Sequence, residues 1–265
     1  MCRVCVTVRI FRPLHETFTV LFRVIPARKR PRLMFVLAAH AIFDACIQYG
    51  NGCLKAGDGG ENMNNGKTVS FTAMKDGTLS DYQLLEELEK PYLARTAMRV
   101  LDELERQGKN TLEGYKLTRL DHALQSATRA VKDGADVDWV VGTLLHDIGD
   151  GLAPQNHDRY SAEVIRPFVR EEVTWVVEHH GIFQMLYYAH HYGWDENARD
   201  NFKDHPGFTS CSDFCERWDQ SSFDPEYEAE PLTFFEPMVV SVFSRKAYDP
   251  AFLQAGVYNG LPEIK

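Results

Sequence analysis

Apolar residues repeated at three- and four-residue steps restrict the fold of this sequence more than any other feature. The clearest run forms one helical stripe and ends beside a His-Asp pair: Val137, Val140, Val141, Leu144, Leu145 and Ile148. Similar spacing predicts helices from Ser80 to about Leu104 and over 120–131, 157–169, 171–180, 210–220 and 232–244. Strand-like alternation is nearly absent, so we expect an all-α helical bundle.

The first 66 residues differ from the rest in composition. Residues 1–32 hold eight Lys and Arg against one Glu, an apolar run follows at 33–43, and residues 50–67 are rich in Gly, Asn and Lys. These features fit a transit peptide, a secretory-like signal, or an upstream start ahead of Met63. We therefore divide the chain into a disordered or non-native leader and linker, 1–66, and a helical bundle, 67–265.

Charge and cysteine content limit the classes of function. Residues 33–265 hold 21 basic and 37 acidic residues, so we expect no nucleic-acid partner. The apolar run at 33–43 is shorter than the roughly 20 residues of a membrane span, so we expect no membrane partner. Six cysteines are too few for a disulfide scaffold, which favours a cytoplasmic protein, with organelle import by the leader as the alternative. The sequence predicts no oligomeric state.

Possible metal ligands recur at the ends or on the buried faces of the expected helices. His146 and Asp147 end the 137–148 stripe, whose first turn Asp136 or Asp138 can cap. Three more histidines take comparable places, at the start of 120–131, the start of 157–169 and the end of 171–180: His122, His157 and His180. A late carboxylate completes the set, and helical spacing leaves Asp213 and Asp219 as alternatives.

The number of ligands favours two metal ions over one. His122, the His146-Asp147 pair and one late Asp are enough for a single ion, but His157 and His180 add two nitrogens. Six ligands can hold two ions if one carboxylate bridges them, and Asp147 is the natural bridge. Imidazole and carboxylate together suit iron, zinc or manganese, and with no thiolate in the set we expect a pair of irons.

These residues resemble the HD-domain superfamily, whose His…His-Asp…Asp pattern is met by His122, His146-Asp147 and an Asp in 213–219. Within that superfamily, Leu144-Leu-His-Asp-Ile-Gly149, His157-Asp-Arg-Tyr160 and Glu216-Arg-Trp-Asp219 are similar to motifs of the mixed-valent diiron oxygenases. Those are the organophosphonate-cleaving HD oxygenases and the myo-inositol oxygenases. The resemblance covers about 110–245 and implies Asp219 as the last ligand. It implies two iron ions, held by His122, His146, Asp147, His157, His180 and Asp219.

The resemblance also implies a reaction. It points to an enzyme that uses O2 to cleave a C–C or C–P bond in a small, polar, hydroxylated substrate, with one iron binding the hydroxyl and the other activating O2. The alternative is an HD-type metal-dependent phosphohydrolase of a nucleotide or phosphomonoester. Hydrolysis is disfavoured because no clear Arg/Lys cluster accompanies the ligands, although Arg119, Arg129 and Arg159 could serve.

Polar residues near the ligands are candidates for substrate binding: Tyr115, Arg119, Asp150 and Gln184. Tyr115 stands where the aminophosphonate enzymes place a Glu, and Gln184 where they place a Lys. Asp150 stands where the inositol oxygenases place a Lys. The substrate of neither group is therefore predicted.

Arg119 and two further pocket candidates, Tyr187 and Tyr188, also have simpler interpretations. Arg119 can instead pair with Asp121 on the same helix. Tyr187 and Tyr188 are further candidates for the substrate pocket, where aromatic rings could hold a quaternary ammonium group, or they are ordinary core or surface aromatics.

Overall fold

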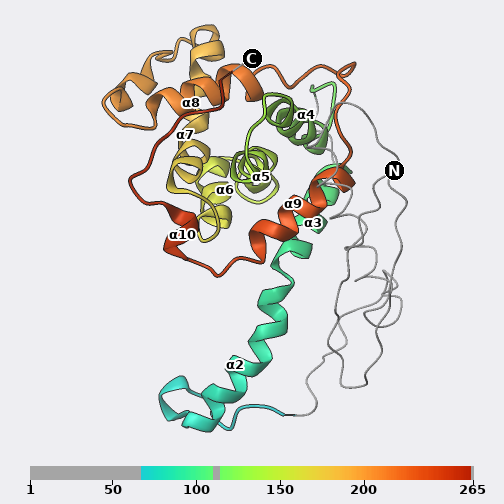
Figure 1. The fold of residues 1–265 in the computed structure, drawn as a ribbon, viewed down its shortest axis with the longest axis vertical. Helices are drawn as coiled ribbons and strands as arrows, with labels where there is room; N and C mark the ends of the chain where they lie inside the picture. Colours follow the sequence, from blue (N-terminus) through green and yellow to red (C-terminus); the bar gives the residue numbers. More distant parts are fainter. Residues whose placement is uncertain (1–66, 110–113, 264–265) are drawn as a thin grey trace, which may run out of the picture. The chain divides into compact units, whose positions relative to one another are not determined.

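The computed structural model describes residues 67–109 and 114–263. The predicted leader and linker, residues 1–66, lie outside these ranges. Within them the chain forms helices and no strand, which confirms the all-α prediction (Figure 1). None of the helices in the described ranges has both the length and the apolar character that crossing a membrane requires.

α5 (Val137–Leu145) lies at the centre of the bundle. Its residues from Asp138 to Leu145 are all buried, and four helices pack around it (Figure 1): α4 (Arg119–Lys132), α6 (His157–Ile165), α7 (Glu171–Tyr188) and α9 (Leu232–Phe243). Gly142 permits close contact with α7, because a Cβ at this position would overlap the Val173 side chain. His146 and Asp147, which follow α5, are therefore attached to a rigid, buried helix.

Side-chain caps set the starts of the two helices that lead into the site. For α4, Thr118 and Asp121 form a capping box, with Asp121 N donating to Thr118 Oγ1 at 3.1 Å. For α5, Asp136 accepts hydrogen bonds from the backbone N of Asp138 and of Trp139, at 3.0 and 3.2 Å. Asp136 is thus the cap, while Asp138 is buried and accepts a hydrogen bond from Arg170 N.

Two helices end at places that differ from the expected ones. α6 ends at Ile165 rather than near Val169, because Pro167 has no N–H with which to continue the helix. α7 continues past His180 to Tyr188, so the predicted end at His180 is wrong. Gly181 does not stop this helix. Its missing side chain leaves room for Asp158, whose Oδ2 would lie 3.2 Å from a Cβ there.

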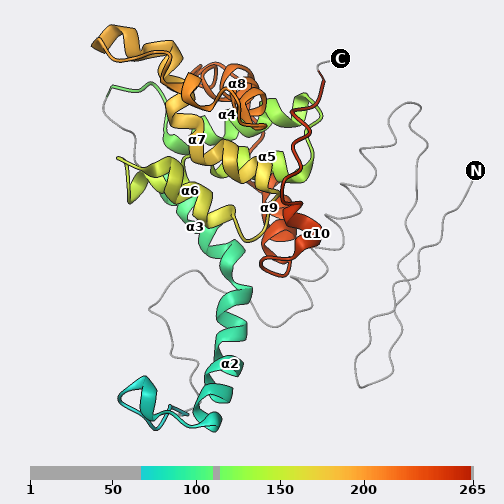
Figure 2. The same ribbon diagram turned by 90° about the vertical axis from the view of Figure 1, so that its left-hand side faces the viewer.

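The remaining elements complete the chain around this core (Figures 1 and 2). The helical run expected from Ser80 forms two helices that meet at Arg95, and the predicted helix at 210–220 is an α-helix followed by a π turn. The elements are η1 (Met74–Asp76), α2 (Leu79–Ala94), α3 (Thr96–Gln107), η2 (Ile148–Gly151), η3 (Ala189–Tyr192), η4 (Ala198–Phe202), α8 (Phe208–Phe214), η5 (Cys215–Asp219) and α10 (Pro250–Leu253).

A buried carboxylate joins α7 to α8 and to the C-terminal segment. Glu172 has no exposed surface. It accepts hydrogen bonds from Ser210 Oγ at 2.7 Å, Gly260 N at 2.8 Å and Asn259 N at 3.2 Å. Three donors satisfy one buried carboxylate, so its removal leaves all three without this acceptor.

We expect Glu172→Ala to lower the free energy of unfolding by about 2–4 kcal/mol, because the buried donors lose a charged acceptor. Glu172→Gln keeps one acceptor oxygen and should cost about half as much. Urea unfolding followed by circular dichroism measures both values. A loss below about 1 kcal/mol for the alanine variant would contradict this role.

Candidate metal centre

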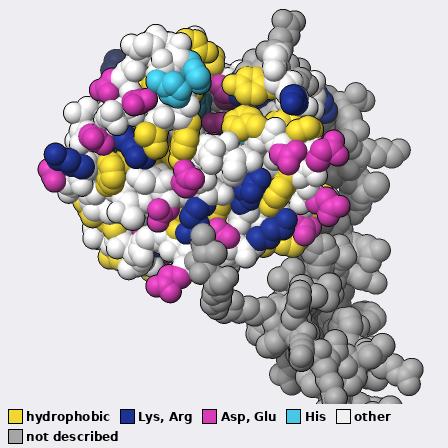
Figure 3. Space-filling view, turned by 90° about the horizontal axis from the view of Figure 1, so that it is seen from above, with side chains coloured by type: hydrophobic (Ala, Val, Ile, Leu, Met, Phe, Trp, Pro, Cys, Tyr) yellow, Lys and Arg dark blue, Asp and Glu magenta, His cyan; other side chains and the backbone are white. Residues whose placement is uncertain are grey.

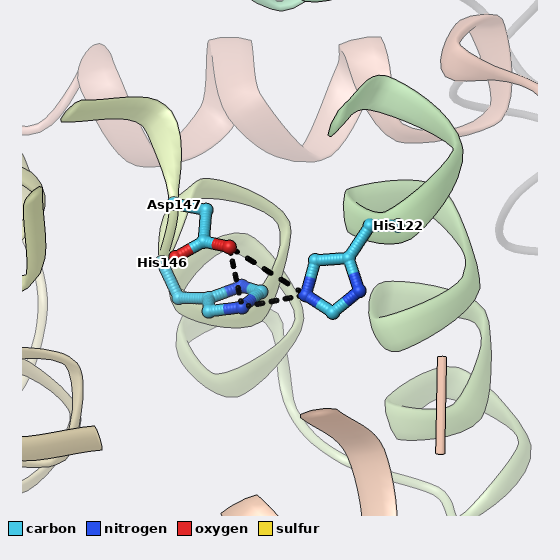
Figure 4. A group of neighbouring side chains, drawn as sticks. All are labelled: His122, His146 and Asp147. Atoms are coloured by element: carbon cyan, nitrogen blue, oxygen red, sulfur yellow. Dashed lines mark hydrogen bonds and ion pairs between the residues drawn. The ribbon is translucent and has the colours of Figure 1, made fainter. Parts of the chain in front are cut away.

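Four helices and one π turn bring the six expected ligands together. His122 lies in the first turns of α4, His146 and Asp147 follow α5 directly, and His157 opens α6. His180 lies in the middle of α7, and Asp219 ends η5. Figure 4 shows His122 pointing from α4 towards His146 and Asp147. His122, His146, His180 and Asp219 are buried, while Asp147 and His157 are half-buried.

The four imidazoles are held in the same way, by a backbone contact at Nδ1. Each has Nδ1 in hydrogen-bond distance of a backbone carbonyl oxygen: His122 with Ser222 at 2.9 Å, His146 with Thr143 at 2.7 Å, His157 with Pro154 at 3.3 Å and His180 with Val177 at 2.7 Å. A carbonyl can only accept, so Nδ1 carries the proton in every ring. In the neutral state each Nε2 therefore presents a lone pair to the centre, as in metal-binding histidines.

The Asp147 carboxylate divides the histidines into two pairs. Its Oδ1 lies 3.2 Å from Nε2 of His157 and 3.2 Å from Nε2 of His180. Its Oδ2 lies 3.6 Å from Nε2 of both His122 and His146. Asp219 belongs to the second pair, with Oδ1 at 3.2 Å from His122 Nε2 and 3.5 Å from His146 Nε2. One carboxylate therefore faces two separate sets of donors.

The charges and polar atoms of this cluster fit a bound cation. The Nε2 atoms of His122 and His146 are 3.1 Å apart, a separation at which two lone pairs repel unless a proton or a metal ion lies between or beside them. Asp219 Oδ2 is buried without a hydrogen-bond partner. Three overlapping groups in the described chain have ligand atoms within 4.8 Å of one another and could hold a metal ion.

The pKa shifts in the cluster also fit a bound cation. Burial alone would raise the pKa of Asp147 and of Asp219, but neighbouring imidazoles, His146 foremost, hold both pKa values well below the usual range. Burial opposes the charged form of His180, but the hydrogen bond and charge of Asp147 outweigh it and raise the pKa of His180 to about 9. The site therefore holds two ionised carboxylates, Asp147 and Asp219, which attract positive charge.

A close backbone approach at Gly149 and side-chain hydrogen bonds at Asp133 position two of the ligands. A Cβ at Gly149 would lie 2.7 Å from the His157 carbonyl oxygen, so only glycine lets the start of α6 approach so closely. Asp133, at the end of α4, accepts from Arg217 Nη2 at 2.7 Å and Trp218 Nε1 at 2.8 Å. These bonds hold η5 against α4 directly before Asp219. Asp213, the alternative carboxylate, lies in α8 and is in none of the three groups.

The predicted substrate residues lie at different places around the cluster. Arg119 forms an ion pair with Asp150, and Asp121 serves the capping box instead. Burial lowers the pKa of Arg119, while the charge of Asp147 acts against that shift. Tyr115 is exposed. Gln184 is half-buried on α7, one turn after His180.

Aromatic side chains border the same region, and one of them was not predicted. Phe223, in the loop after η5, stacks on His122 with ring centroids 4.5 Å apart and also contacts the Tyr115 ring at 5.8 Å. Burial raises the pKa of Tyr188, whose ring contacts those of Tyr192 and Trp194. Tyr187 instead donates to Glu216 at 2.7 Å. The sequence signal for Phe223 was its place at the start of Phe223-Asp-Pro-Glu-Tyr, a stretch after Asp219 that resembles one in the diiron oxygenases, but no role was predicted for it.

Histidine side chains also reach the surface. In the face drawn in Figure 3 they adjoin hydrophobic side chains, while basic and acidic side chains are interspersed elsewhere on that face.

The late cysteines lie behind the cluster and outside all three ligand groups. Cys211 and Cys215 are fully buried free thiols, and Cys215 Sγ donates to the His180 carbonyl at 3.6 Å. Burial, with Cys211 as the nearest neighbour, raises the pKa of Cys215 well above its usual value. Both thus behave as the small core residues that their spacing indicated. The four earlier cysteines lie outside the described residues.

Comparison with known proteins agrees with this geometry. A family model described as "HD domain" matches residues 119–219, from the first residue of α4 to the end of η5. Residues 119–219 are an HD domain. All six clustered residues fall inside it. Together with the ligand groups, the HD domain supports a metal-dependent enzyme.

A curated protein of Leisingera caerulea is similar over part of its length. It is the [1-hydroxy-2-(trimethylamino)ethyl]phosphonate dioxygenase (glycine-betaine-forming), and it is 32% identical over 87 residues. The match covers 29% of this chain and 44% of the relative, so the chain spans less than half of that protein. This relative supports the resemblance to the oxygenase branch of the HD superfamily.

We expect His180→Ala to lower the amount of bound metal per chain, because it deletes one nitrogen on the Oδ1 side of Asp147. His179→Ala is the matched control. The His179 ring faces Trp175, with Nδ1 bonded to the Trp175 carbonyl at 2.8 Å, and it belongs to none of the ligand groups. Metal analysis of both purified variants measures the difference, and equal metal content would contradict a ligand role for His180.

Proposed function

We propose that this chain is a non-haem diiron oxygenase that uses O2 to cleave a C–C or C–P bond in a small, polar, hydroxylated substrate. The observation that carries the proposal is the division of the Asp147 carboxylate, with one oxygen towards His157 and His180 and the other towards His122 and His146. A single ion would need only one of these sets. Two sets of donors joined by one carboxylate suit two ions.

The donor set favours iron. Imidazole nitrogens and carboxylate oxygens, without thiolate, match the ligands of non-haem iron enzymes. His122, His146, Asp147 and Asp219 would hold one ion, and His157, His180 and the other oxygen of Asp147 the second. When bound, the irons would supply a Lewis acid for the substrate hydroxyl and a reductant for O2.

Arg119 is our candidate for recognition of an anionic group on the substrate. Its guanidinium is held by Asp150, and the charge of Asp147 acts on its pKa. A planar guanidinium can bind two oxygens of a phosphonate at once. Gln184 is neutral, so in our proposal Arg119 provides the positive charge that Gln184 lacks, and Asp150 orients it.

Aromatic rings would cover the substrate and exclude water. Phe223 stacks on His122, and Tyr115 contacts Phe223. The name of the Leisingera caerulea relative states that its substrate carries a trimethylamino group beside a phosphonate. Aromatic faces attract such a cation, so a hydroxylated phosphonate with a quaternary ammonium group is the first substrate that we propose for this chain.

The diiron proposal is tested by purification without oxygen, metal analysis and electron paramagnetic resonance after partial oxidation. We expect about two irons per chain and a mixed-valent signal that changes when substrate is added. Oxygen uptake is then measured with [1-hydroxy-2-(trimethylamino)ethyl]phosphonate and with myo-inositol. His157→Ala should lose one iron and the oxygen uptake, because it removes a ligand from one set only.

The competing phosphohydrolase gives a different pattern. It requires one ion held by His122, His146, Asp147 and Asp219, and a metal-bound hydroxide that attacks phosphorus. A single ion that is not iron, full activity in His157→Ala, or phosphate release from phosphomonoesters without oxygen uptake would contradict the oxygenase and support this enzyme class.

We expect Arg119→Gln to raise KM for a phosphonate substrate about tenfold or more, because a charged pair of hydrogen bonds to the substrate is lost. Arg159→Gln, which removes an exposed arginine of α6, is the control and should leave KM unchanged. Steady-state oxygen uptake measures both. An unchanged KM in Arg119→Gln would show that the anionic group binds elsewhere.

A further inference from the structure

Arg129 on α4 holds the loop that follows the last ligand. It lies two turns after His122 on the same helix, so both side chains are on the same face of α4. Its Nη2 donates to the Ser221 carbonyl at 2.8 Å, and its Nε donates to Ser222 Oγ at 3.2 Å. The Tyr227 ring covers the guanidinium, with its centroid 4.2 Å from Cζ. The donors of Arg129 are therefore used within the chain.

Ser222 joins Arg129 to two of the metal ligands. It has no exposed surface. Its backbone carbonyl accepts a hydrogen bond from Nδ1 of His122 at 2.9 Å, and its backbone N donates to the Asp219 carbonyl at 2.9 Å. Its hydroxyl accepts from Arg129 and donates to the Trp218 carbonyl. A displacement of Ser222 would therefore change the ring position of one ligand and the backbone position of another.

Both of these ligands belong to the same side of the centre, here called the His122 set: His122, His146, Asp219 and Oδ2 of Asp147. The histidines at Oδ1 of Asp147 are anchored elsewhere, His157 by the Pro154 carbonyl and His180 by a carbonyl of its own helix. A partner at Nδ1 keeps the proton there and directs Nε2 at the metal, and losing such a partner typically costs about 10- to 100-fold in metal affinity.

We propose that Arg129 is a positioning residue for the His122 set and that it acts through Ser222. The guanidinium fixes the backbone at 221–222, and the Ser222 carbonyl keeps the proton of His122 on Nδ1, so that Nε2 faces the ion. The proposal rests on the metal centre alone. It holds for the oxygenase and for the phosphohydrolase, because both would use the His122 set.

The test is the zinc affinity of two reference proteins, both full chains, measured by competition with a chromophoric chelator. Zinc accepts imidazole and carboxylate ligands. The His157→Ala reference keeps the His122 set intact, and the His122→Ala reference disrupts it. We expect Arg129→Gln to lower the zinc affinity about tenfold in the first reference. In the second it should have no effect, because the residue through which it acts on the metal is already missing.

Lys132→Gln in the His157→Ala reference is the matched control. Lys132 Nζ lies 4.4 Å from the Tyr227 ring centroid and donates to Tyr227 Oη at 3.1 Å. The change removes a positive charge from the same helix and the same ring but leaves the contacts of Ser222 in place, so the zinc affinity should not change. Circular dichroism establishes that each variant is folded.

Two further variants in the His157→Ala reference grade the effect. Arg129→Lys keeps the charge but cannot reproduce the two donor directions of the guanidinium, so its loss of zinc affinity should be smaller than that of Arg129→Gln. Ser222→Ala removes the hydroxyl that meets Arg129 Nε and should also lower the zinc affinity. It provides the test if Arg129→Gln does not fold.

An unchanged zinc affinity for Arg129→Gln in the His157→Ala reference would overturn the proposal. An equal loss in both reference proteins would do the same, because a general structural role produces that result. Zinc binding by neither reference would overturn the metal centre and this proposal with it. The expected pattern in a chain that consumes no oxygen would support the role of Arg129 and contradict only the oxygenase.

Discussion

The Asp147 carboxylate is the contact on which the rest of the site depends. Two pairs of histidines from different helices meet at its two oxygens. Asp219 lies in a further ligand group with His146 and His180, one histidine of each pair. Such a cluster is electrostatically costly, because six ionisable groups are collected in a largely buried space. The bundle tolerates it because every imidazole is anchored at Nδ1 by a backbone carbonyl, so each ring can turn only one edge to the centre.

The placement of Asp147 follows from the buried helix before it. α5 is enclosed on all sides, and its close contact with α7 at Gly142 brings the Val173 to His180 face of α7 against the same end of the bundle. At Gly149 the absent side chain then allows α6 to begin within contact distance. Two glycines thus position two helices, and each of those helices contributes a histidine to the Oδ1 side of the carboxylate.

Much of this arrangement could be predicted from the sequence, because it depends on local spacing. The α5 stripe ends at His146 and Asp147. A histidine on the apolar face of a helix is expected to point towards the core, and this expectation needs no knowledge of how the other helices pack. Features that depend on contacts between distant segments could not be predicted. α7 continues past His180 through Gly181, and the pairing of Arg119 with Asp150 depends on how η2 meets α4. Phe223 lies in a loop, where no periodic pattern exists to indicate that its ring covers His122.

The choice between Asp213 and Asp219 shows where helical periodicity ceases to apply. In η5 the backbone N of Gln220 bonds to the carbonyl of Cys215, five residues earlier, instead of four. The wide turn holds one residue more than an α-helical turn, so the residues after it are rotated by about 100° relative to an unbroken helix. The number of residues between Cys215 and Asp219 is therefore constrained independently of their identity. The contacts of Arg217 and Trp218 with Asp133 hold this turn in place, and loss of a single residue would restore the ordinary helix and turn Asp219 away from His122.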